Sequence, residues 1–103
     1  MIEYSPAAQT DLQRILMDVY DISRDEETTR RYVRALVDKV EAKAEHPRSG
    51  IPLYWEDRFT GYYYVVYKAY LGFYYIVPGG ICVERFLPAK SDYGRWLTEG
   101  PRS

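Results

Sequence analysis

The sequence predicts a small α+β protein in which a helical hairpin packs on an antiparallel β-sheet. A short β-type segment at residues 2–4 is followed by two runs with apolar residues at helical spacing, which fill nearly the first half of the chain. Three runs rich in aromatic and β-branched residues lie in the second half. The expected order of elements is therefore β-α-α-β-β-β, with a short helical turn near the C-terminus.

Each helix has a recognisable start and an apolar stripe. Ser5 followed by Pro6 is a typical N-cap with proline at the first helical position. The stripe of the first helix consists of Leu12, Ile15, Leu16, Val19 and Ile22. Ser23 with Glu26 three residues later has the pattern of a capping box that opens the second helix. The stripe of the second helix consists of Val33, Leu36, Val37, Val40 and Ala44. The connection between the helices is short, so we expect them to be antiparallel.

The sheet is predicted from Gly61 onward. Residues 47–60 are too apolar for a free linker, and we expect them to form a loop that packs against the domain. Strands are predicted over residues 62–68, 70–77 and 81–87, because these runs are rich in β-formers and a Pro-Gly-Gly turn separates the last two.

Both faces of this predicted sheet are apolar or aromatic. Residues 61–77 hold seven of the chain's twelve tyrosines. Strand alternation places Tyr62, Tyr64, Val66 and Lys68 on one face and Tyr63, Val65 and Tyr67 on the other. In the next strand Tyr70, Tyr74 and Ile76 alternate with Leu71, Phe73 and Tyr75. One face covers the helices, and an apolar second face is typical of a surface that binds a partner. Stacking of nucleobases on these rings is a second interpretation.

Length and charge set limits on function. We expect a single domain over residues 1–97 and a flexible tail over residues 98–103. Fourteen Lys and Arg oppose 15 Asp and Glu, which gives a formal net charge of −1. No net positive field therefore draws the protein toward nucleic acid, although a local basic patch is still compatible with this total.

Cysteine, histidine and the N-terminal sequence indicate a cytoplasmic protein without a cofactor or metal. Cys82 is the only cysteine, so neither an intrachain disulfide nor a thiolate zinc cluster can form. His46 lies at the expected end of the second helix, so we interpret it as a residue that caps the last carbonyls rather than as a metal ligand. The sequence has no basic region ahead of an apolar run and no apolar run long enough to span a membrane.

Four sequence segments, taken in order, carry a family resemblance. They are YSPAAQTDLQRI, YVRALVDKVEAKAEHPRSG, YLGFYYIV and VERFLPAKSDYGRWL. Over residues 2 to about 97 the chain resembles the RelE/ParE superfamily of toxins from bacterial type II toxin–antitoxin modules, which includes plasmid stabilisation proteins. The resemblance implies growth arrest that is neutralised by a cognate antitoxin, and it leaves a homodimer open. RelE-like members cut messenger RNA in the ribosome, whereas ParE-like members poison DNA gyrase.

The residues favour a ParE-like toxin and keep the ribonuclease as the alternative. Leu71 occupies the position similar to the middle-strand arginine of the ribonucleases, and Pro88 occupies one where related toxins often have a histidine. A ribonuclease would have to use Arg85, Lys90 and Tyr93 as its catalytic residues. A ParE-like toxin binds its target without catalysis, and the resemblance points to Lys68, Arg85, Lys90, Tyr93 and Arg95 as the target-binding residues. The antitoxin would cover Leu71, Phe73 and Tyr75. An inactive toxin-like binding protein is the third interpretation.

Two neighbouring charged residues have competing interpretations. Simple alternation puts Arg85 on the same side as Ile81, Val83 and Leu87, where a half-buried guanidinium needs a partner. A structural arginine bonded to carbonyls or a carboxylate is the favoured interpretation, ahead of a phosphate or target contact. Glu84 is expected on the opposite face as a solvated carboxylate rather than as a catalytic base.

Overall fold

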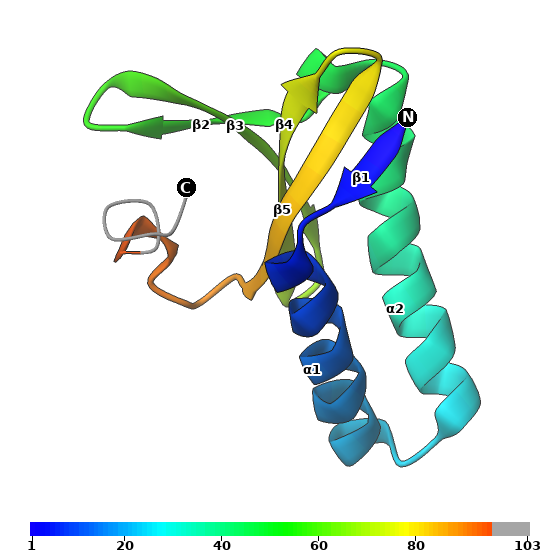
Figure 1. Cartoon of the computed structure of the whole chain (residues 1–103). Helices are drawn as coiled ribbons and strands as arrows, with labels where there is room; N and C mark the ends of the chain where they lie inside the picture. The colour runs from blue at the N-terminus through cyan, green and yellow to red at the C-terminus, as the bar shows by residue number, and fades with distance from the viewer. Residues whose placement is uncertain (96–103) are drawn as a thin grey trace.

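The computed structural model of the chain describes residues 1–95 and has two helices packed on one face of a five-stranded sheet (Figure 1). The N-terminal half comprises β1 (Ile2–Tyr4), α1 (Pro6–Ser23), α2 (Glu26–Glu41) and two 3-10 turns at Ala42–Ala44 and Pro47–Ser49. The C-terminal half comprises β2 (Ile51–Trp55), β3 (Arg58–Tyr67), β4 (Tyr70–Val77) and β5 (Gly80–Pro88). The order in the sheet is β1-β5-β4-β3-β2, with β1 parallel to β5 and the other pairs antiparallel. The predicted α+β class is confirmed.

One strand of the sheet was not predicted. The segment 47–60, expected to be a packed loop, contains β2 and the start of β3. These strands are joined through Glu56 and Asp57, whose φ angles of 51° and 67° are those of a tight hairpin turn. Pro52 interrupts the apolar run that forms β2, and proline is tolerated only on an edge strand such as this one. The predicted tail at residues 98–103 lies outside the described part of the chain.

The predicted helix starts are right for α1 and wrong for α2. The Ser5 hydroxyl accepts a hydrogen bond from the Ala8 amide at 2.9 Å, as expected of an N-cap. The cap of α2 is Asp25 rather than Ser23, and its carboxylate accepts from the Thr28 amide at 2.9 Å. Asp25 lies one residue from the first helical position, so its carboxylate reaches that amide directly.

The core has two parts, one on each face of the sheet. The larger part lies between the sheet and the helical hairpin and consists of Ala8, Ile15, Leu36, Val40, Tyr63, Val65, Tyr74, Ile81, Val83 and Phe86. The smaller part lies on the outer face and consists of Leu53, Tyr62, Leu71, Phe73 and Leu87, with Tyr64, Tyr75 and Tyr93 packed against it. The predicted alternation of β3 and β4 is thus confirmed. Ile22, predicted in the stripe of α1, is 86% exposed.

Tyr74 joins the sheet to the turn that precedes β2. Its hydroxyl donates to the Pro47 carbonyl at 2.6 Å and accepts from the Gly50 amide at 3.1 Å. Burial raises the pKa of Tyr74 to about 12. The hydroxyl therefore anchors residues 47–50 to the centre of the sheet.

We expect Tyr74→Phe to lower the free energy of unfolding by about 1–2 kcal/mol at neutral pH, because both backbone groups lose their partner. The pKa of Tyr74 is raised in the folded state, so the free energy of unfolding of the wild type falls as the pH rises from about 10 toward the raised pKa. Tyr74→Phe lacks this group, so its free energy of unfolding should fall less over the same pH range. Urea unfolding between neutral and alkaline pH measures both effects. Tyr54→Phe, at a tyrosine that is 58% exposed, is the matched control and should leave stability unchanged.

Candidate functional site

Arg85 forms a buried ion pair that ties β5 to the first helix. Its Nε donates to Asp11 Oδ2 at 2.7 Å and its Nη2 to Asp11 Oδ1 at 3.0 Å. The Phe86 amide donates to the same Oδ2 at 2.9 Å. The side chain of Asp11 is 1% exposed and that of Arg85 is 19% exposed. The hydrogen bonds to Asp11 raise the pKa of Arg85. The favoured structural interpretation of Arg85 therefore agrees with its surroundings.

A β-bulge in β5 changes the face of the sheet that Arg85 shares with its neighbours. Phe73 is paired with Arg85, but Tyr74 is paired with Val83, so Glu84 is an extra residue in the strand. The alternation reverses at that point. Arg85 thus follows the side of Leu87 and Phe73, and the predicted shared face with Ile81 and Val83 is wrong.

Two of the other predicted target-binding residues, Lys68 and Lys90, lie near the same end of the sheet. The Ala89 amide donates to the Ala69 carbonyl at 2.8 Å, which joins the segment after β5 to the turn between β3 and β4. Lys68 lies in that turn, with its ammonium 5.9 Å from the ring centre of Tyr32, and Lys90 follows Ala89 as an exposed residue. We call Lys68 and Lys90 together the basic rim.

Tyr93 and its neighbour Gly94 cover part of the outer face. The ring of Tyr93 lies 5.6 Å from that of Phe73, between centres. A Cβ atom at Gly94 would lie 2.5 Å from the Trp55 ring, so only glycine allows this close approach. Tyr93, which the family resemblance singled out for target contact, packs on the sheet here. Arg95 directly follows Gly94 and is exposed.

The predicted antitoxin-binding residues are less accessible than expected. Phe73 is fully buried and Leu71 is 5% exposed, whereas Tyr75 is half-buried. The expectation that the outer face is left uncovered is wrong at its centre, because Leu53 of the unpredicted strand β2 and Tyr93 pack there. No local pattern indicated this cover, because it depends on contacts between distant segments.

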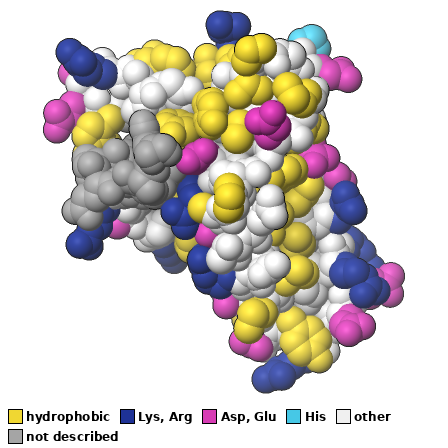
Figure 2. Space-filling model, in the orientation of Figure 1, with side chains coloured by type: hydrophobic (Ala, Val, Ile, Leu, Met, Phe, Trp, Pro, Cys, Tyr) yellow, Lys and Arg dark blue, Asp and Glu magenta, His cyan; other side chains and the backbone are white. Residues whose placement is uncertain are grey.

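Sequence reasoning missed an apolar groove along the helical hairpin. The groove has a volume of about 550 Å³, and its apolar lining is Leu16, Val33 and Val37. Its rim carries Arg30, Arg31 and Arg34 from α2. Hydrophobic side chains run between the helices toward the hairpin tip, with basic side chains along the α2 edge (Figure 2). The four-residue spacing of Arg30 and Arg34 was the available signal.

The three arginines at the edge of the hairpin groove form only weak ion pairs. Arg30, Arg31 and Arg34 lie 3.9, 3.5 and 3.8 Å from Glu26, Glu27 and Asp38, respectively, all as pairs four residues apart. Every side chain in these pairs is more than 60% exposed. Exposed pairs of this kind contribute at most about 0.5 kcal/mol, so a partner's carboxylates can replace them.

The fold and these surfaces define a small α+β protein with a basic rim at one end of its sheet and an arginine-lined groove on its hairpin. Among residues 1–95 no group of three or more His, Cys, Asp and Glu is arranged to hold a metal ion. Within the same residues no helix is long and apolar enough to cross a membrane.

The chain belongs to the ParE toxin family. Residues 2–93 match the model of the ParE toxin of the type II toxin–antitoxin system, parDE. The fold of this protein is similar to that of a chain from the chromosomal ParDE toxin–antitoxin system of P. aeruginosa, with a TM-score of 0.69 and 16% sequence identity. That match covers 86% of this chain and 95% of the other. No curated protein sequence matches the chain.

Proposed function

We propose that this toxin arrests growth by binding bacterial DNA gyrase in the cytoplasm, and that a cognate antitoxin neutralises it. The match to the ParE toxin model across residues 2–93 carries this proposal. The residues that a ribonuclease mechanism would need offer further support, because Arg85 is engaged by Asp11 and Tyr93 packs on Phe73. A binding mechanism has no need of a proton-transferring group.

The basic rim is the proposed contact with the target. Lys68 and Lys90 lie on segments joined by the Ala89–Ala69 hydrogen bond, and both side chains are exposed. Arg95 is a further exposed cation, on the segment that follows β5. Arg85 contributes by holding β5 against α1, and Tyr93 by fixing the segment that carries Arg95.

The hairpin groove is the proposed seat of the antitoxin. Leu16, Val33 and Val37 offer an apolar floor, and the weakly paired arginines at the rim favour an acidic partner. An amphipathic helix with apolar residues at helical spacing and carboxylates beside them fits this surface. On the sheet, Tyr75 is the accessible member of the predicted set, whereas contact with Phe73 would require Tyr93 to move.

The proposal is tested by expressing the chain alone in bacteria. We expect growth arrest with DNA breaks and altered plasmid supercoiling, and rescue on co-expression of the reading frame next to the toxin gene. The double variant Lys68→Glu/Lys90→Glu should weaken the arrest by roughly tenfold in the inducer needed, since charge reversal repels the target.

The control is Lys39→Glu, which makes the same lysine-to-glutamate change at an exposed position near the end of α2, away from the basic rim. It should arrest growth like the wild type. Cleavage of ribosome-bound transcripts without DNA breaks would overturn the proposal in favour of a ribonuclease, and the lack of any growth effect would indicate an inactive relative.

A further inference from the structure

A second groove lies where β3 and β4 separate. The β3–β4 ladder ends at Tyr62 and Tyr75. Beyond this point residues 58–59 of β3 pair with β2, whereas Ile76 and Val77 pair with β5. The gap between the diverging strands forms a groove of about 590 Å³, which we call the strand gap.

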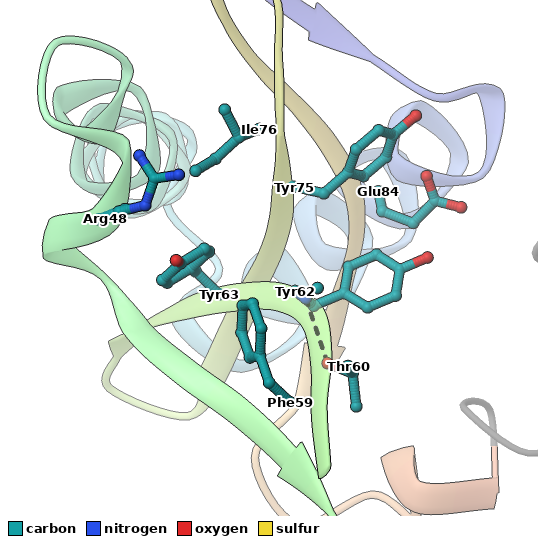
Figure 3. A pocket seen from close by; sticks show the side chains of 9 residues that line it. Arg48, Phe59, Thr60, Tyr62, Tyr63, Tyr75, Ile76 and Glu84 are labelled. Atoms are coloured by element: carbon teal, nitrogen blue, oxygen red, sulfur yellow. Dashed lines mark hydrogen bonds between the residues drawn. The ribbon is translucent and has the colours of Figure 1, made fainter.

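The strand gap has a different wall on each face of the sheet. Arg48, Tyr63 and Ile76 lie on one side of it, and Tyr62, Tyr75 and Glu84 lie on the other (Figure 3). Phe59 and Tyr63 contact each other with ring centres 5.3 Å apart, which gives the first side an aromatic surface. Tyr62 and Tyr75 do the same on the second side at 5.9 Å.

The floor of the gap is held in place by Thr60. Its hydroxyl donates to the Leu53 carbonyl at 2.8 Å and accepts from the Tyr62 amide at 3.1 Å. Gly61 follows with a φ angle of 93°, and an added Cβ atom there would meet no atom within 4 Å. The bend in β3 is therefore fixed, and space remains above it.

The backbone edges in the gap are suited to an added strand. The edge of β4 at residues 76–77 that faces β3 has no paired residue within the described ladders, and neither has the facing edge of residues 58–61. Strand edges of this kind form main-chain hydrogen bonds with an extended peptide. A strand lying in the gap would send alternate side chains to the two faces.

The charges of the gap select the peptide. Arg48 and Glu84 form no ion pair among residues 1–95 within 4.0 Å, and they lie on opposite faces. Glu84 is the residue that the bulge adds to β5, so the bulge gives this carboxylate its position. An incoming acidic side chain matches Arg48, and a basic one matches Glu84.

We propose that the strand gap binds a short extended segment of a partner protein by β-strand addition. The segment carries an acidic residue on the Arg48 face, a basic residue on the Glu84 face, and apolar or aromatic side chains between them. Because the two faces alternate along a strand, the acidic and basic residues are separated by an odd number of positions. This site is independent of the basic rim and of the hairpin groove.

The test is a selection of random displayed heptapeptides on the purified full chain. We expect enrichment of peptides with an acidic and a basic residue at an odd separation around an apolar one. Arg48→Glu should weaken binding of the selected peptides by roughly tenfold. A repeated selection on this variant should replace the acidic residue that faces position 48 with a basic one. Glu84→Lys should shift the other position from basic to acidic. The matched control is Arg31→Glu, at the edge of the hairpin groove. It should change neither of the two selected positions.

Three results would overturn this inference. They are the lack of any enriched peptide, an enriched set that ignores both Arg48→Glu and Glu84→Lys, and self-association of the wild-type chain that Arg48→Glu abolishes. Arg48→Ala, at an exposed residue, provides a second variant if the reversed charge affects folding. Growth arrest on expression should be unchanged in Arg48→Ala, so failure of the gyrase proposal is distinguished from failure of this one.

Discussion

Replacing Asp11 with alanine is expected to lower the free energy of unfolding by about 3–5 kcal/mol, because the change removes the carboxylate that pairs with a largely buried guanidinium. The Asp11 carboxylate accepts two hydrogen bonds from Arg85 and one from the Phe86 amide, at 2.7 to 3.0 Å. The alanine variant also leaves the Phe86 amide without an acceptor. Urea denaturation followed by circular dichroism gives the difference.

Two matched variants separate this effect from a general loss of charge. Asp38→Ala removes a carboxylate from an exposed pair with Arg34 and should change stability by less than about 0.5 kcal/mol. Asp11→Asn keeps an oxygen for the Phe86 amide and should fall between the two. A cost below about 1 kcal/mol for Asp11→Ala would contradict the structural role of Arg85 and return that residue to the set of direct target contacts.

Phe73→Ala is the second large effect, with an expected loss of about 3–5 kcal/mol in the free energy of unfolding. Phe73 is fully buried, and its ring lies 5.6 Å from the rings of both Tyr64 and Tyr93, between centres. The substitution leaves a cavity at the centre of the outer face and removes the surface on which Tyr93 packs. Thermal and urea unfolding measure the loss.

The control for Phe73 lies on the same face of the sheet. Val66 is paired with the outer-face residue Leu71 and is 39% exposed, so Val66→Ala should cost less than about 1 kcal/mol. Proteolysis after Arg95 should also be faster in the Phe73→Ala variant, because the segment that carries Tyr93 loses its contact. Equal and small losses in the two variants would mean that the outer face is uncovered, as the sequence alone suggested.

Local patterns predicted most of the fold. The Ser5 cap, the helical stripes and the alternation of β3 and β4 each depend on residues within a few positions of one another, where backbone geometry fixes the outcome. The strand β2 was missed because Pro52 breaks a run that otherwise has β-type composition. Proline is tolerated in β2 because β2 is at the edge of the sheet. Which strand lies at the edge depends on how all the strands pair, and a local pattern does not contain that information.

The candidate sites were predicted less well because they depend on distant residues. Asp11 and Arg85 are 74 positions apart, and the bulge at Glu84 that directs Arg85 cannot be read from an uninterrupted β-type run. The basic rim forms because Ala89 bonds to Ala69, which brings Lys68 and Lys90 to the same end of the sheet. Sequence composition identified these cations, but only the register of the strands places them.

The most direct test of the proposed function uses purified bacterial DNA gyrase with plasmid DNA and ATP. The toxin alone should inhibit supercoiling and cause linear DNA to accumulate, and the protein encoded by the neighbouring reading frame should restore normal activity. The Lys68→Glu/Lys90→Glu variant should need about tenfold more protein for the same effect. Unaffected gyrase, together with cleavage of messenger RNA by the toxin in a translating ribosome extract, would contradict the proposal.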